Sequence, residues 1–131
     1  MADLPDVFNR LRRLLARHEP GLEWRDAYIG SQAKVKKPAY HLYGKDLVSI
    51  LGRKPERIYF AGTVLNKNFV SLYFMPMYCH PDKFQEMDPS LKKLVKGKSC
   101  FNIKELDPEI IDQFDQTLSL GRQLYQQSGW I

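Results

Sequence analysis

Two apolar, strand-like segments separated by three residues constrain this fold more than any other feature of the chain. Residues 58–65 and 69–77 form the two segments, and Asn66, Lys67 and Asn68 connect them. Asparagine tolerates left-handed backbone and bonds to its own main chain, so this connection predicts a tight turn. A loop this short joins antiparallel strands. Residues 69–77 are almost continuously apolar, which indicates a central position in a sheet.

Shorter strand-like segments lie on either side of this hairpin. Residues 39–43 are largely aromatic, residues 47–51 are largely apolar, and residues 44–46 between them predict a tight turn. Residues 99–103 predict a last strand. Together with the hairpin, these segments indicate an antiparallel sheet of about five strands.

Amphipathic helical patterns flank the strands at both ends of the chain. Residues 4–18 are preceded by Asp3 as a helix cap, and a second long helix is expected from the Asp107 cap to about Gln127. Gly121 on the apolar face of the second helix predicts a close approach to the sheet. In both segments apolar residues recur at three- and four-residue spacing and so share one face: Leu4, Val7, Phe8, Leu11, Leu14 and Leu15 in the first, and Ile110, Ile111, Phe114, Leu118 and Tyr125 in the second.

Two stretches between these elements carry weaker signals. Residues 22–37 fit either a short second helix or an irregular edge, with residues 30–37 as an exposed loop. Residues 77–98 predict a connection with its own short helices, one of which starts at Asp88 with Pro89 in its first turn. Strands that follow one another directly, with helices at the ends, predict an α+β fold in a single domain spanning residues 1–131.

Composition places the chain among ordinary globular proteins. Of its 131 residues, 44% are hydrophobic and 27% are charged, and no apolar run approaches the roughly 20 residues of a bilayer span. The first residues lack the pattern of a secretory leader. Two cysteines in a chain of this length make no disulfide framework and suit a reducing compartment. We therefore expect a cytoplasmic protein.

No catalytic motif accompanies this composition. The glycines are too scattered for a phosphate-binding loop, and no serine occupies a G-x-S-x-G elbow. Cys79, His80 and Asp82 place metal ligands close together, but zinc needs four, and Cys100 and His41 would have to join them by folding. The alternative is a buried cysteine beside a loop histidine. These features favour a binding protein without a resident cofactor over an enzyme.

Three groups of side chains are candidate binding sites. Carboxylates of the second helix share one side and suggest a weak cation site; the alternative is that they complement the helix dipole on a solvated face. Aromatic residues of the strands suggest a ligand pocket between sheet and helix, or else core packing. Lysines before the first strand suggest binding of an anion or nucleic acid, or else a solubilising surface. The residues are Glu109, Asp112 and Asp115 for the cation, Tyr40, Tyr43 and Tyr73 with Tyr59 and Trp24 for the pocket, and Lys34, Lys36 and Lys37 for the anion.

Three runs of sequence resemble the YdhG-like domain family. They are KKPAYHLYGKDLVSIL, FVSLYFMPM and LKKLVKGKSCFNIKELDP with the helix that follows, and the resemblance covers roughly residues 4–125. It implies a sandwich of helices on a sheet, similar to frataxin, and one branch of the family is described as intracellular iron chaperones. Iron by this route would bind surface carboxylates. The sequence departs from that pattern, because its first helix carries Arg10, Arg12, Arg13 and Arg17, which repel a cation.

These observations lead to three expectations about function. The first is a small binding module of the YdhG-like type, with iron as the ligand implied by the resemblance alone. The second is a protein that binds nucleic acid or an anionic ligand through its lysine and arginine groups, in keeping with a net charge of +5. The third is a subunit that pairs with a second copy through an exposed sheet edge.

Overall fold

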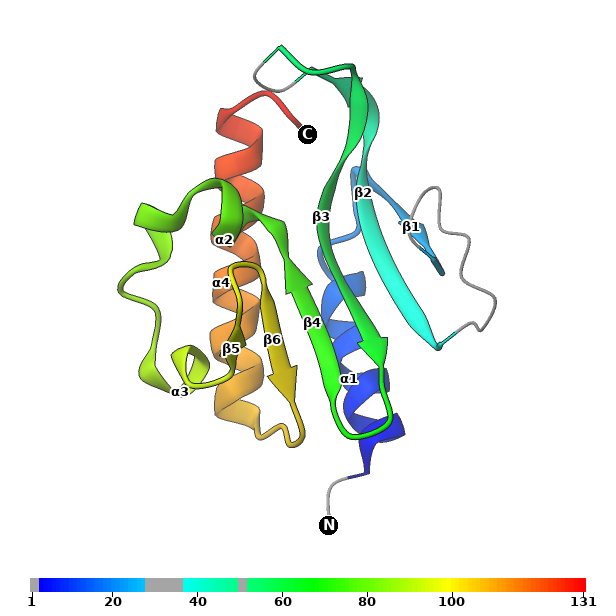
Figure 1. The fold of residues 1–131 in the computed structure, drawn as a ribbon, viewed down its shortest axis with the longest axis vertical. Coiled ribbons are helices and arrows are strands. Elements are labelled where there is room, and N and C mark those ends of the chain that lie inside the picture. Colours follow the sequence, from blue (N-terminus) through cyan, green and yellow to red (C-terminus); the bar gives the residue numbers. More distant parts are fainter. Residues whose placement is uncertain (1–2, 28–36, 50–51) are drawn as a thin grey trace.

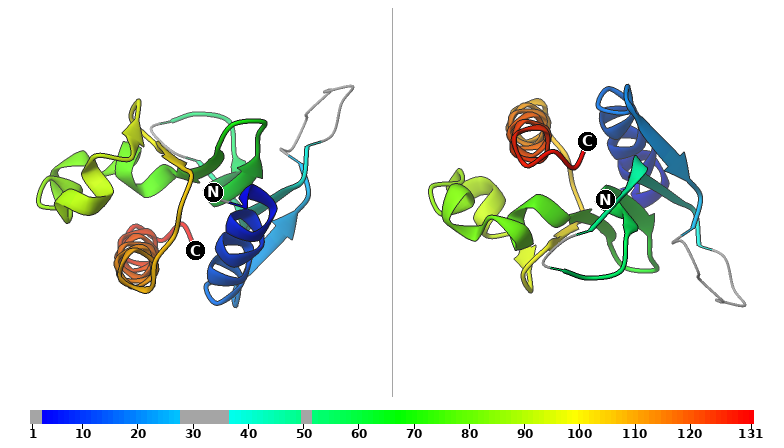
Figure 2. Two further views of the ribbon diagram at one scale, coloured as in Figure 1. Left: turned by 90° about the horizontal axis from the view of Figure 1, so that it is seen from below. Right: turned by 90° about the horizontal axis from the view of Figure 1, so that it is seen from above.

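A computed structural model describes residues 3–27, 37–49 and 52–131 of the chain. In these residues a six-stranded antiparallel sheet is covered on one face by two helices (Figures 1 and 2). The strands lie in the order β1-β2-β3-β4-β6-β5. The predicted α+β fold is confirmed, with one strand more than the five expected. No helix of the described segments is both long and apolar enough to cross a bilayer.

Helix α1 spans Leu4–Ala16 and follows the predicted pattern. The Asp3 carboxylate caps it by accepting a hydrogen bond from the backbone N–H of Asp6 at 3.3 Å. The helix ends two residues before the predicted boundary. Its apolar residues form the buried face that was expected, and all but the half-buried Leu4 are fully buried: Val7, Phe8, Leu11, Leu14 and Leu15.

The central hairpin consists of β3, Glu56–Leu65, and β4, Val70–Phe74. Its turn is closed by a hydrogen bond from the Asn66 N–H to the Phe69 carbonyl at 3.0 Å, which confirms the predicted connection. The prediction that the second strand continues to residue 77 is wrong. Met75–Cys79 forms the short helix α2 with Pro76 in its first turn, since proline cannot donate to a sheet ladder but suits a helix start.

Strand β2 spans Ala39–Val48 without interruption, so the tight turn predicted at residues 44–46 is wrong. Gly44 pairs with Leu22 of the neighbouring strand, which holds it in the sheet. The pairing with β3 jumps from Tyr43 opposite Tyr59 to Leu47 opposite Arg57. The residues that carried the turn signal are therefore extra residues in an irregular, bulged part of one strand.

Both edge strands were missed by the sequence patterns. β1, Leu22–Arg25, pairs with β2 in the stretch where a helix or an irregular edge was expected. β5, Val95–Lys96, pairs with β6, Cys100–Ile103, where the preceding short helix was expected to continue. Residues 28–36, which include most of the predicted loop at 30–37, lie outside the described residues.

The connection after α2 and the last helix follow their start signals. After the 3-10 turn η1, Pro81–Phe84, helix α3, Pro89–Lys92, begins with the Asp88 carboxylate accepting the Ser90 N–H at 2.8 Å. Helix α4, Pro108–Gln127, begins with the Asp107 carboxylate accepting the Ile110 N–H at 2.8 Å. Both helix starts are confirmed, because a capping aspartate and a following proline suit the first turn.

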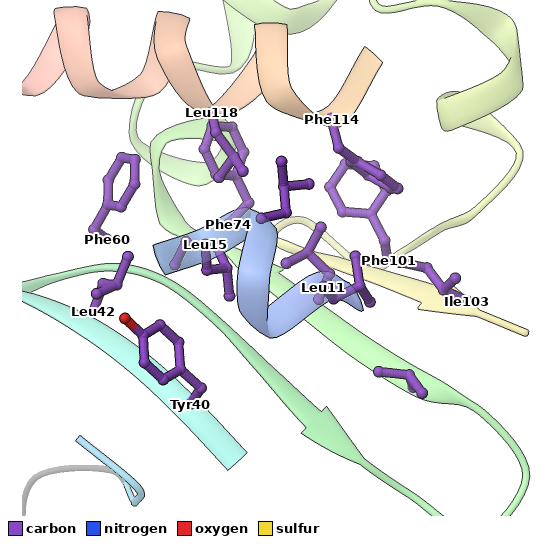
Figure 3. Close-up of a cluster of buried hydrophobic side chains, with 14 of the residues drawn as sticks. Leu11, Leu15, Tyr40, Leu42, Phe60, Phe74, Phe101, Ile103, Phe114 and Leu118 are labelled. Carbon is purple, nitrogen blue, oxygen red and sulfur yellow. The ribbon is translucent and has the colours of Figure 1, made fainter. Parts of the chain in front are cut away.

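The core lies between the two long helices and one face of the sheet (Figure 3). Gly121 allows α4 to lie against the sheet, since an added Cβ would stand only 2.5 Å from Cζ of Phe74. The close approach predicted from the sequence is therefore present. The largest side chains of this core are completely buried, among them Leu11, Leu15, Leu42, Phe60, Phe74, Phe101, Phe114 and Leu118.

Candidate functional site

The sheet presents a second set of side chains on the face away from α1 and α4. Successive residues of a strand point to opposite faces. Leu42 and Phe74 face the helices and belong to the core, so Tyr43 and Tyr73 next to them point the other way. Tyr59 is directly opposite Tyr43 in the ladder and shares its face. Alternation along three neighbouring strands thus brings three tyrosines together.

A hollow of about 230 Å³ lies among these tyrosines. The rings of Tyr43 and Tyr59 meet edge to face, with centroids 5.2 Å apart and an interplanar angle of 77°. Tyr43 is buried, whereas Tyr59 and Tyr73 are partly exposed. The surface of the hollow is mostly apolar. We call this feature the tyrosine hollow, lined by Tyr43, Tyr59, Tyr73, Phe74, Met75 and Ser99.

A buried histidine forms a hydrogen bond with Tyr59. Nδ1 of His41 lies 2.8 Å from the Tyr59 hydroxyl, and the His41 side chain is buried. Burial lowers the pKa of His41 to about 4, against the opposing effect of the Asp26 carboxylate. At neutral pH the imidazole is therefore uncharged. The Tyr125 hydroxyl donates to the main-chain carbonyl of Tyr59 at 2.9 Å and so fixes the same residue from the helix side.

Gly62 provides the space in which this pair meets. Gly62 is directly opposite both His41 and Tyr73 in the sheet. A Cβ at position 62 would lie 2.1 Å from the Tyr59 hydroxyl oxygen and 2.3 Å from Nδ1 of His41. A side chain there would occupy the place of the hydrogen bond. The absence of a side chain at Gly62 is thus what allows His41 to bond to Tyr59, one of the residues that line the hollow.

A cysteine lies across the ladder from Tyr73. Cys100 is partly buried, and its Sγ lies 3.6 Å from the main-chain carbonyl oxygen of Phe101, the next residue in the chain. Burial raises the pKa of the Cys100 thiol, although a hydrogen bond with Ser71 acts in the other direction. The thiol therefore stays protonated at neutral pH and lacks the thiolate character of a nucleophile. Of the described residues that line the hollow, the three tyrosines and Ser99 carry hydroxyl groups that can form hydrogen bonds.

Tyr40 does not join the other two tyrosines that the sequence grouped with it. It faces the helix layer, where its hydroxyl donates to the Glu19 carboxylate at 2.6 Å. Burial, followed by this hydrogen bond and the charge of Glu19, raises the pKa of Tyr40 above its ordinary value. Trp24 stacks on it with centroids 5.9 Å apart. Tyr43 follows Tyr40 by three positions, an odd offset, so regular strand alternation puts them on opposite faces.

The carboxylates of α4 do not form a cation site with one another. Glu109 and Asp112 are exposed, and Asp115 is engaged by His18, whose Nε2 lies 2.7 Å from Oδ1. Across residues 3–27, 37–49 and 52–131, no three His, Cys, Asp or Glu side chains converge in a way that could hold a metal ion. The cysteine and histidine at positions 79 and 80 likewise gain no such partners there.

The predicted lysine site is described only in part. Lys34 and Lys36 lie outside the described residues. Lys37 is exposed, and its Nζ donates to the side-chain oxygen of Asn66 at 2.8 Å. The anion-binding hypothesis for these lysines stays a prediction.

Comparison with protein-family models, with curated proteins and with solved structures finds no match. The resemblance to YdhG-like domains therefore stays a prediction. The fold and the candidate site are established from the residues themselves.

The sequence patterns found part of the tyrosine hollow and missed the rest. Tyr43, Tyr59 and Tyr73 carry a signal, because aromatic residues on paired strands at matching alternation share a face. Met75 and Ser99 carry no such signal. Met75 directly follows β4 and Ser99 directly precedes β6, and the sequence patterns placed both residues inside the strands. The three tyrosines of the hollow also point away from the helix layer, whereas the pocket was expected between sheet and helix.

Proposed function

We propose that this protein is a binding module that takes a small, uncharged, planar molecule into the tyrosine hollow. The observation that carries the proposal is the convergence of Tyr43, Tyr59 and Tyr73 around an open volume of about 230 Å³. Mostly apolar concavities with a few placed polar groups are the usual sites for small ligands. Aromatic walls favour flat ligands, because ring pairs gain about 0.5–1.5 kcal/mol beyond the area they bury.

The charge state of the hollow supports a neutral ligand. None of the described residues that line it carries a charged side chain, and the His41 imidazole that bonds to Tyr59 is uncharged at neutral pH. A buried ionic group without a partner would be disfavoured there. The Ser99 hydroxyl in the lining can orient a ligand that carries a hydroxyl or carbonyl group. The lining favours recognition over covalent chemistry, because the neighbouring Cys100 thiol stays protonated.

The test is a screen of neutral one-ring and fused two-ring compounds by chemical-shift mapping on isotope-labelled protein. We expect the hits to shift the signals of Tyr43, Tyr73 and Ser99. Replacing one wall in Tyr73→Ala should weaken their binding about tenfold, from lost ring contact and buried area. Tyr78→Ala is the matched control, because Tyr78 is exposed and lies outside the hollow.

Thermal unfolding of both variants would establish that the fold is retained. Binding that is equally strong in the wild type and in Tyr73→Ala would refute the proposal. So would a screen in which all hits map to other surfaces.

A further inference from the structure

A second concavity, of about 320 Å³, lies in the helix layer, away from the tyrosine hollow. It is located where the end of α1 meets the second half of α4, two helices that run side by side (Figure 2). Unlike the tyrosine hollow, it is lined almost entirely by polar and basic side chains. We call it the arginine cleft, lined by Arg17, His18, Pro20, Ser119, Arg122, Gln123 and Gln126.

Two guanidinium groups reach the cleft from different elements. Arg17 is the residue at the C-terminal cap of α1 and is exposed. Arg122 is half-buried on α4, with Ser119, Gln123 and Gln126 on the same polar side of the helix, because they recur at three- and four-residue spacing. The cleft therefore combines two fixed positive charges with a hydroxyl and two amide groups, all of which can donate hydrogen bonds.

The base of the cleft is held together by hydrogen bonds between α4 and His18, which follows the end of α1. The Arg122 guanidinium donates to the His18 carbonyl, and His18 Nε2 is 2.7 Å from the Asp115 carboxylate. The Asp115 carboxylate of α4 is thus engaged with the imidazole of a residue that lines the cleft. At the other end of the helix pair, Arg10 donates to the Leu106 carbonyl at 3.3 Å. The arginine cleft is built on a rigid frame, which lowers the entropic cost of binding.

We propose that the arginine cleft binds a small phosphate-bearing anion. A guanidinium presents donors in a planar fork that matches phosphate oxygens, and such charge-assisted hydrogen bonds are about twice as strong as neutral ones. The Arg17 guanidinium, the N–H groups of Arg122 other than the one that bonds to His18, a serine hydroxyl and two amides offer more donors than the two oxygens of a carboxylate can accept. The three or four acceptor oxygens of a phosphate group match this set. The site is independent of the tyrosine hollow and goes beyond the function proposed for it.

The test is a titration of the full chain with inorganic phosphate and with pyrophosphate at constant ionic strength, by calorimetry and by NMR of the arginine side chains. We expect saturable binding that shifts the Arg17 and Arg122 Nε–H signals. Arg17→Gln should weaken it about tenfold, the effect of one lost charged hydrogen bond. Arg12→Gln is the matched control, since it removes the same charge from the same helix but lies outside the cleft.

A charge-neutral variant separates a built site from general attraction. Ser119→Ala is exposed and should fold normally, and we expect it to weaken phosphate binding severalfold. Arg122→Lys keeps the charge but removes the fork, so binding should weaken in it as well. The unfolding temperature of each variant is measured alongside, because Arg122 also bonds to His18.

Three results would overturn the proposal. The first is an absence of saturable binding at millimolar phosphate or pyrophosphate. The second is an equal effect of Arg12→Gln and Arg17→Gln, which would indicate a diffuse surface charge. The third comes from a parallel titration with a single-stranded oligonucleotide. If only the oligonucleotide binds, and its affinity falls steeply as salt is added, the basic surface recognises a nucleic-acid backbone. The cleft is then not a small-ligand site.

Discussion

Gly62→Ala is the substitution that tests most directly how the sheet builds its candidate site. Gly62 does not lie in the left-handed region of the backbone, so alanine meets no conformational strain there. Its methyl group would instead stand 2.1 Å from the Tyr59 hydroxyl and 2.3 Å from Nδ1 of His41. The methyl and the His41–Tyr59 hydrogen bond cannot occupy the same space. The side chains must move apart, and Tyr59, which lines the tyrosine hollow, moves with them.

The expected loss of stability follows from two opposing effects. Overpacking a filled site costs about 1–3 kcal/mol, while alanine in place of glycine restricts the unfolded chain and recovers roughly 0.4–1 kcal/mol. We expect a net destabilisation of about 1.5 kcal/mol. With an unfolding entropy of about 2.1 cal/mol/K per residue over 131 residues, this lowers Tm by roughly 5 °C.

Urea unfolding of a double-mutant cycle provides the assay. Tyr59→Phe removes the oxygen nearest to the added methyl, so Gly62→Ala should cost about 0.5–1 kcal/mol less in that background than in the wild type. An unchanged slope of free energy against urea would show that the variants unfold from equally compact states. Equal costs of Gly62→Ala in the two backgrounds would refute the steric reasoning, as would an alanine variant as stable as the wild type.

Three further predictions concern the core, the last helix and the buried histidine. Gly121→Ala should lower stability by about 1–2 kcal/mol despite the higher helix propensity of alanine, because the new Cβ would lie 2.5 Å from Phe74; a raised Tm would contradict the close packing. Asp107→Ala should cost about 1 kcal/mol in urea unfolding through loss of the cap on Ile110, whereas Asp107→Asn should be nearly neutral, and equal losses would rule out a capping role. The pKa of His41 is about 4 in the folded protein, against an ordinary value of 6.5 in the unfolded chain. Between these two values the unfolded chain binds a proton that the folded protein does not. The stability of the fold is therefore undiminished above pH 6.5 and falls as the pH is lowered towards 4, by up to about 1.4 kcal/mol per pH unit. His41→Gln should flatten the dependence of the unfolding free energy on pH in this range, and identical profiles for the two proteins would contradict the assignment.

The elements that could be predicted from the sequence are those whose signals are local. The capping aspartates at positions 3, 88 and 107 each begin a helix, because a side chain three residues or fewer away satisfies the exposed N–H groups. The hairpin turn at Asn66 is equally local. Apolar periodicity also identified the buried face of α1, since one helix side must face the core wherever that helix lies.

What could not be predicted depends on pairing between distant segments. β1 is four residues long and β5 is two, and each is a strand only because a neighbour completes its ladder. Likewise, the residues around Gly44 are typical of a turn in isolation, but pairing with Leu22 draws them into β2. The arginine cleft could not be predicted for the same reason, because only the tertiary fold brings Arg17 and Arg122 to one concavity.

The hydrogen bonds that link the α1 region of the chain to the α4 region also bear on how the chain acquires its structure. They join residues 96 to 104 positions apart: Arg10 to Leu106, His18 to Asp115 and Arg122 to His18. Contacts of such wide separation form slowly, because a large loop must close before any of them is gained. The strands of the central hairpin are joined by a short connection, so they can pair without first closing a large loop. Kinetic intermediates of this protein should therefore contain a protected β3–β4 ladder while α1 and α4 still exchange their amide protons freely.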